Sequence, residues 1–257
     1  MDIIDFLMPL VSQRFQTDEK YRNGHIRVIN PLPERKILGV HVPQMKALAK
    51  ELSRRDDALD VICRLEKSEK NGHKLYYEET VVWGLMINYL KIPSGAKYQL
   101  LQKYIPVLDN WGVCDTFCCS AKWIKDKEEL WKFLQPYWKS SREFEVRFAV
   151  IMSMVYFLSP EWFSKVCRMT DSLDFGRIHS DYVSAVHGIP AGTKGTVSGN
   201  TPYYVRMAVA WLLATALSKI PDETKLYVNN CSLPDDVIKL YARKARESFR
   251  TRHIPAF

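Results

Sequence analysis

Apolar residues recur along most of the chain with a helical period. In the first segment they stand at positions 3, 4, 6, 7, 10, 11 and 15, which is the spacing of one face of an α-helix. Similar amphipathic segments follow up to the C-terminus, whereas the strict alternation that is typical of strands is almost absent. The pattern therefore predicts an all-α protein of about a dozen helices joined by short loops.

Turn and capping residues divide the pattern into separate helices. Ser140-Ser-Arg-Glu143 predicts a capping box in front of one of them. Further helices are predicted to begin at Pro160, Pro202 and Pro221, where the missing N–H costs little. The remaining predicted helices cover residues 3–15, 43–54, 58–69, 75–90, 97–107, 110–124, 127–134, 144–157 and 234–249.

The spacing of these helices predicts a repeat architecture. Successive helix pairs span roughly 35–45 residues, which is the length of a HEAT-like repeat. We therefore expect residues 1–257 to form a single domain of HEAT-like helical repeats. No repeated sequence motif is present, so a compact all-α globule remains the alternative.

One segment, residues 188–200, interrupts the helical pattern. It is rich in Gly and small polar residues and predicts a flexible loop. Gly192, Lys194 and Gly195 partly match a phosphate-binding loop. The spacing departs from G-x-x-x-x-G-K-[ST] and no strand precedes it, which argues against nucleotide binding.

The composition is that of a globular protein with a basic surplus. Hydrophobic residues make up 47% of the chain and charged residues 26%. Lys and Arg number 37 against 29 acidic residues, for a net charge of +8, and the pI is near 9.1. This surplus favours a polyanionic partner such as nucleic acid, although many basic proteins bind none.

Cysteine usage and apolar runs favour a metal-free cytoplasmic protein. The six cysteines form no C-x-x-C pair, and the group at 114–119 has no His nearby, so we expect no metal site. Free thiols fit a reducing cytoplasm. The N-terminus lacks the pattern of a secretory signal, and the apolar runs 81–90 and 208–217 are too short to span a membrane.

The most suggestive chemistry lies in residues 109–122, DNWGVCDTFCCSAK. On a helix, Trp111 and Asp115 are four residues apart and share one face. An aromatic surface beside a carboxylate suits a substrate that is cationic or becomes cationic in the transition state. A packed aromatic residue beside a capping or surface acid explains the same spacing.

Three further features allow a functional and a structural interpretation. Arg147 shares a helix face with apolar residues, so it either contacts a phosphate or forms a buried ion pair. Trp211 follows a helix segment of small residues and, on pattern alone, fits the core better than a site. A basic stripe on the last helix suits DNA phosphates as well as a solvated face; it consists of Lys239, Arg243, Arg246 and Arg250.

Several of these stretches, in this order, are similar to one known family. They are residues 37–43 (ILGVHVP), 77–79 (YEE), 109–118 (DNWGVCDTFC), 141–150 (SREFEVRFAV), 203–211 (YYVRMAVAW) and 244–250 (KARESFR). Together they resemble the HEAT-like DNA alkylation-repair glycosylases over most of the chain from about residue 36 onward.

The resemblance implies a curved α-solenoid whose basic concave face holds duplex DNA containing alkylated purines. It implies excision of N3- and N7-alkylated purines by a monomer that needs no cofactor or metal. By motif, Trp111, Asp115 and Trp211 would line the lesion site, and Arg147 would hold the phosphate backbone. A looser match assigns Tyr21 to the cleft that contains this lesion site. The loop 188–200 departs from the tighter connection that the family predicts.

The residues are consistent with the chemistry that this family implies. An N3- or N7-alkylated purine already carries a positive charge and leaves without a general acid, so the barrier lies in an oxocarbenium-like sugar. Asp115 could stabilise that charge and orient the attacking water. The alternative from another class is a non-catalytic HEAT-like scaffold that binds nucleic acid or protein.

Overall fold

The computed structural model describes residues 2–182 and 202–257. Within these ranges every regular element is helical and no strand is present, which confirms the all-α prediction. The chain divides into two compact units, Met1–Ile124 (unit 1) and Lys125–Phe257 (unit 2). The predicted loop 188–200 lies outside the described residues.

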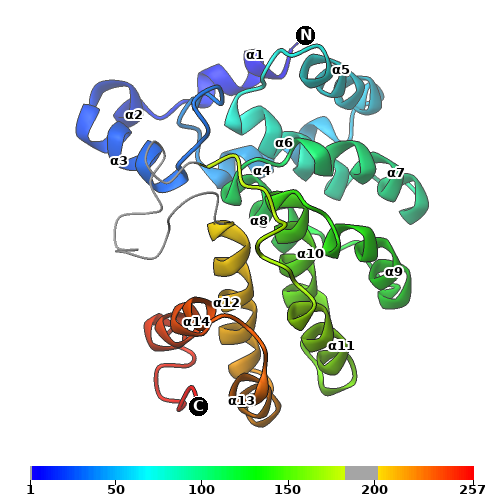
Figure 1. Cartoon of the computed structure of the whole chain (residues 1–257). Coiled ribbons are helices and arrows are strands. Elements are labelled where there is room, and N and C mark those ends of the chain that lie inside the picture. The colour runs from blue at the N-terminus through cyan, green and yellow to red at the C-terminus, as the bar shows by residue number, and fades with distance from the viewer. Residues whose placement is uncertain (1, 183–201) are drawn as a thin grey trace. The chain divides into compact units, whose positions relative to one another are not determined.

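Unit 1 is built around α6 (Tyr77–Tyr89), which contacts α1, α4, α5, α7 and α8 (Figure 1). All its residues except the last are buried, as expected for a helix that is apolar on every side. The other helices of the unit are α1 (Ile3–Leu7), α2 (Gln13–Thr17), α3 (Glu19–Ile29), α4 (Val42–Leu52), α5 (Ala58–Lys70), α7 (Ser94–Tyr104) and α8 (Trp111–Ser120).

Buried polar groups fix the loops of unit 1 to these helices. The carboxylate of Glu78, on α6, accepts backbone N–H bonds from Leu38, Gly39 and Val40 at 2.9, 2.7 and 3.3 Å. Gly39 has φ of +91°, and an added Cβ would overlap the ring of Phe15. The sequence 38–40 can therefore close over the acid only with Gly at its centre.

A buried arginine joins three distant parts of unit 1. Arg35 is fully buried and forms ion pairs with Asp109 at 2.7 Å and with Glu69 at 2.5 Å. Its guanidinium also donates to the carbonyl of Leu75 at 3.0 Å. Because Asp109 lies just before α8, this cluster anchors the start of that helix.

The first predicted helix, residues 3–15, is interrupted in the structure. It consists of α1, a 3-10 turn at Met8–Leu10, and α2. Pro9 lacks the N–H that a continuous helix needs, and Ser12 adopts φ and ψ outside the helical region. The apolar period was therefore correct for the buried side chains but not for the backbone.

Unit 2 is built around α12 (Tyr203–Leu217), which contacts α10, α13 and α14 (Figure 1). Small residues of α12, such as Ala208 and Ala210, are completely buried and allow close packing. The other helices are α9 (Lys127–Trp138), α10 (Glu143–Tyr156), α11 (Pro160–Asp171), α13 (Pro221–Asn230) and α14 (Asp235–Glu247).

Two local predictions for unit 2 are wrong. The N-cap of α10 is Arg142 without a side-chain cap, so Ser140 and Glu143 do not form the predicted capping box. The last helix ends at Glu247 instead of residue 249, so Arg250 lies in the segment that follows α14 and not on its basic stripe.

In the part of the chain that the structure describes, none of the helices combines the length and the hydropathy of a membrane span. The same residues contain no group of three or more His, Cys, Asp or Glu side chains arranged to hold a metal ion. All six cysteines are free thiols.

Candidate functional site

The start of α8 is fixed by Asn110. Its side-chain oxygen caps the helix by accepting the N–H of Gly112 at 2.7 Å. Its amide nitrogen donates to the carbonyl of Ile29 at 2.8 Å, at the end of α3. One buried side chain therefore sets α8 against α3.

Trp111 is the first residue of α8 and is half-buried. Its indole N–H donates to the carbonyl of Val28, in the last turn of α3, at 3.2 Å. The bond fixes the orientation of the ring, and it uses the only polar group of the indole. Only the hydrocarbon surface of Trp111 remains to contact a substrate.

Asp115 lies one turn after Trp111 on α8, and 8% of its surface is exposed. Its neighbour is the hydroxyl of Tyr77, whose pKa is raised by burial and, to a smaller degree, by the carboxylates of Glu78 and Asp115. The Tyr77 phenol can approach α8 closely because residue 112 is Gly. An added Cβ at this position would overlap the Tyr77 hydroxyl. A carboxylate with so little water around it acts strongly on a nearby positive charge.

Tyr21 lies on α3, the helix that receives the Trp111 hydrogen bond. It is half-buried, and the guanidinium of Arg14 lies 4.5 Å from its ring centroid. Val28 is two turns further along α3, about 10 Å along the helix axis. Unit 1 thus brings Trp111 and Asp115 together on α8 and holds the end of α3, the helix of Tyr21, against Trp111.

Arg147 is on α10 in unit 2 and is 3% exposed. Its guanidinium donates to the carbonyl of Tyr204, at the start of α12, at 2.6 Å. It also lies 5.9 Å from the centroid of the Tyr204 ring. The predicted phosphate-binding residue is therefore bound to the protein backbone.

Glu143, one turn before Arg147, was not identified from the sequence as part of this site. Its carboxylate accepts the N–H of Tyr204 at 2.6 Å and the hydroxyl of Ser180. Burial raises the pKa of Glu143 to about 7, although these hydrogen bonds and Arg147 oppose the rise. Glu143 and Arg147 together hold the start of α12. In the sequence, the i, i+4 spacing of Glu143 and Arg147 was the only indication that the two side chains act together.

Trp211 lies two turns after Tyr204 on α12 and is half-buried. It lines a pocket of about 540 Å³ between α12 and the C-terminal segment. The charged and aromatic residues that share this pocket are Lys244, Glu247, Phe249 and Arg250. The structure therefore brings together two predicted site residues, Trp211 and Arg250.

The remaining basic residues of the predicted stripe lie on α14. Lys239 and Arg246 are exposed. Arg243 is half-buried and pairs with Glu247 at 3.6 Å. Of the three stripe residues on the helix, Lys239 and Arg246 are therefore open to an external anion, as is Arg250 beyond the end of the helix.

Comparison with protein families gives a match over much of the chain. The model of the family described as DNA alkylation repair enzyme matches residues 14–173, more than half of the chain. The chain belongs to this family. No curated protein and no solved structure matches it.

The description of this family, DNA alkylation repair enzyme, indicates repair of alkylation damage by an enzyme with DNA as its substrate. The matched range contains Tyr21, Trp111, Asp115 and Arg147. Trp211 and the basic residues of α14 and the C-terminal segment lie beyond it.

Proposed function

We propose that the protein is a DNA glycosylase that hydrolyses the N-glycosidic bond of N3- and N7-alkylated purines in duplex DNA. The observation that carries this proposal is the nearly buried carboxylate of Asp115, one helical turn from the fixed ring of Trp111. The family match, which includes both residues, supports an enzyme acting on alkylated DNA.

The chemistry explains why one carboxylate suffices. An N3- or N7-alkylated purine is a cation, so it departs without protonation, and the positive charge moves to the sugar in the transition state. The Asp115 carboxylate stabilises that charge and orients the attacking water. Loss of one such preorganised group typically costs about 100- to 1000-fold in rate.

Trp111 and Trp211 supply aromatic surface to the same substrate. The indole N–H of Trp111 is bound to Val28, so its ring contributes a hydrocarbon face against the deoxyribose. An aromatic face also attracts the developing positive charge. Trp211, in the pocket with Lys244 and Arg250, contributes the second aromatic surface.

Basic residues hold the DNA backbone in this proposal. Lys239, Arg246 and Arg250 are exposed and suited to phosphate contacts. The half-buried Arg243 contributes a weaker contact, because its guanidinium pairs with Glu247.

Arg147 and Tyr21 have supporting roles in the same proposal. Arg147 acts on the phosphate backbone through the start of α12, because its guanidinium binds the Tyr204 carbonyl there. Tyr21 lines the cleft from α3.

The architecture and setting follow the same proposal. We infer that the helix pairs of both units are HEAT-like repeats of a curved solenoid in a single domain. We also propose a monomer that works without a cofactor. The six free thiols support the cytoplasm as its setting.

A non-catalytic scaffold that binds nucleic acid is the second candidate. The bonds from Trp111 to Val28 and from Arg147 to Tyr204 favour it, because both give a structural role to a proposed site residue. Release of free base from methylated duplex DNA separates the two. The glycosylase releases 7-methylguanine or 3-methyladenine, whereas the scaffold, when folded and bound to the same DNA, releases neither.

A further inference from the structure

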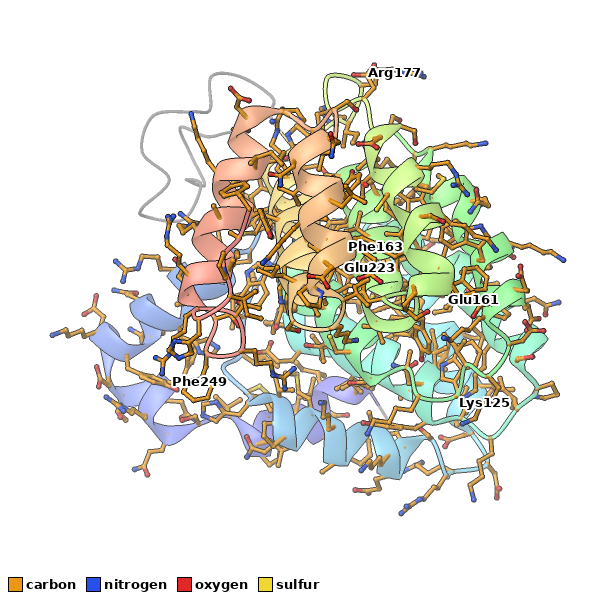
Figure 2. The ribbon with its side chains drawn as sticks, turned by 90° about the horizontal axis from the view of Figure 1, so that it is seen from below. Lys125, Glu161, Phe163, Arg177, Glu223 and Phe249 are labelled. Atoms are coloured by element: carbon orange, nitrogen blue, oxygen red, sulfur yellow. The ribbon has the colours of Figure 1, made fainter. Side chains whose placement is uncertain are left out.

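Phe249 is an unusually exposed aromatic residue in the segment that follows α14 (Figure 2). Its exposed fraction of 77% is the highest among the large hydrophobic side chains that the structure describes. Unit 2 buries most of its other large aromatic residues, including Phe148, Phe157 and Trp162. The exposure of Phe249 therefore requires an explanation.

The segment that carries Phe249 is held in place. The hydroxyl of Thr251, which is buried, donates to the carbonyl of Ala245 at 2.7 Å. The hydroxyl of Tyr241 donates to the carbonyl of Ala256, also at 2.7 Å. These bonds tie both ends of the segment to α14, so the Phe249 ring is presented on a fixed turn.

A cation lies against the ring, and the surrounding sequence is basic. The guanidinium of Arg252 lies 4.5 Å from its centroid. From residue 239 to residue 252 the chain has six Lys or Arg residues against a single acid, Glu247. That acid pairs with Arg243 at 3.6 Å and with Lys244 at 3.4 Å. The local surplus of positive charge favours an anionic partner.

A pocket adjoins the ring. Phe249 lines the same pocket as Trp211. The charged and hydroxyl side chains around them are those of Thr215, Ser218, Lys244, Glu247, Ser248 and Arg250. Its volume, about 540 Å³, lies in the range of pockets that hold small ligands. Aromatic surface, cations and hydroxyl groups therefore line one cavity in unit 2.

This combination suits an unpaired nucleotide better than an intact duplex. A phosphate gains nothing from an exposed phenyl ring, and the faces of paired bases are covered by their neighbours in the stack. A base that has left the stack exposes its π face, which stacks on aromatic side chains while cations hold its phosphate.

We propose that the pocket binds one nucleotide displaced from the DNA duplex, with its base stacked on Phe249 and its phosphate held by Arg250. Lys244 contributes a weaker contact to that phosphate, because it pairs with Glu247 at 3.4 Å. This inference rests on the proposed function, because it takes duplex DNA as the partner. It gives the site a second role, which is to hold the helix open at the damaged pair.

The direct test is a photochemical crosslink. The full chain is bound to a duplex with a single unpaired 5-iododeoxyuridine, and to a matched duplex in which the same nucleotide is paired with adenine. Irradiation, digestion and mass spectrometry then locate the crosslinked residue. We expect Phe249 with the unpaired nucleotide only. A crosslink outside the pocket overturns the proposal.

Binding of variants gives the second test. Wild type is expected to bind the duplex with the unpaired nucleotide about tenfold more tightly than the paired one, from one base stacked on an aromatic ring. Phe249→Ala should lose this preference, and Phe249→Tyr should keep it. Leu226→Ala is the matched control, since Leu226 is 69% exposed on α13 and does not line the pocket. An unchanged preference in Phe249→Ala overturns the proposal.

The phosphate contact and the base contact can be separated. Arg250→Ala should weaken binding of the duplex with the unpaired nucleotide more than binding of the paired duplex, and lower the salt dependence of the former by about one unit of slope. If Arg250→Ala changes the binding of neither duplex, Arg250 does not hold the phosphate in the proposed pocket.

Base release from methylated DNA, measured on the same proteins, distinguishes this inference from the proposed function. A Phe249-dependent preference without any base release supports the nucleotide pocket and contradicts the glycosylase. Base release by wild type, without a preference for the unpaired nucleotide, contradicts the pocket alone.

Discussion

Arg147 donates a hydrogen bond of 2.6 Å to the backbone carbonyl of Tyr204, from a side chain that is 3% exposed. One turn earlier on α10, Glu143 accepts the backbone N–H of the same residue at 2.6 Å. Two ionisable side chains therefore hold the backbone N–H and C=O of one residue at the start of α12. Because Trp211 is on α12, the orientation of a proposed catalytic residue depends on this pair.

We predict that Arg147→Ala destabilises unit 2. It leaves the buried Tyr204 carbonyl without this donor, and a buried polar group that loses its partner costs about 1–3 kcal/mol. Urea unfolding measures the loss. Arg246→Ala is the control, since Arg246 is exposed and its loss should alter only the salt dependence of DNA binding. Equal stability of Arg147→Ala and wild type would show that the bond to Tyr204 is unimportant.

Glu143 should make stability depend on pH. Its folded-state pKa of about 7 lies above the ordinary value of 4.5, so the folded protein binds this proton more tightly than the unfolded chain. The contribution of Glu143 to folding stability is fully present at pH values below 4.5. It falls as the pH rises through the folded-state pKa of about 7, and above that pH it no longer changes. At about 1.4 kcal/mol per pKa unit, the fall is on the order of 3 kcal/mol.

Glu143→Gln should remove that part of the pH dependence. Urea unfolding at several pH values across this window measures the slope for wild type and variant. Glu161→Gln is the matched control, because Glu161 is exposed on α11 and should leave the slope of wild type unchanged (Figure 2). The same slope in Glu143→Gln and wild type would assign the pH dependence to another group.

The sequence was sufficient for most of the helices, but it did not predict α3 (Glu19–Ile29), and it did not give the contacts between helices. Its apolar period located α5 within one residue, because a helix that buries one face leaves that period in the chain. It could not show that Trp111 would bind the carbonyl of Val28, or that Glu143 would bind Tyr204. These partners are 83 and 61 residues apart, and local patterns carry no information on which distant backbone group needs a partner.

The site residues divide in the same way. The i, i+4 spacing correctly put Trp111 and Asp115 on one helix, α8. The pocket that Trp211 shares with Arg250 could not be predicted, because α14 ends at Glu247 and the chain turns back beyond it. The predicted basic stripe assumed that the last helix continues to Arg250, whereas this residue lies in the segment beyond the helix.

Gly39→Ala should destabilise unit 1. The positive φ of Gly39 is unfavourable for Ala, and the new Cβ would overlap the Phe15 ring. Backbone strain alone costs about 1–3 kcal/mol. Gly95→Ala, where the added Cβ meets open space, is the control and should be neutral or slightly stabilising. Thermal unfolding compares the two; equal midpoints would contradict the strain argument.

The most direct test of the central claim is base release by Asp115→Asn. The substitution keeps the size of the side chain and removes its charge. Free base released from methylated duplex DNA is measured in single turnover, together with DNA affinity, for wild type, Asp115→Asn and the exposed-acid control Asp60→Asn. We predict at least a roughly 100-fold slower release by Asp115→Asn at unchanged affinity, with Asp60→Asn as active as wild type. Release by Asp115→Asn at the wild-type rate would contradict the proposed mechanism.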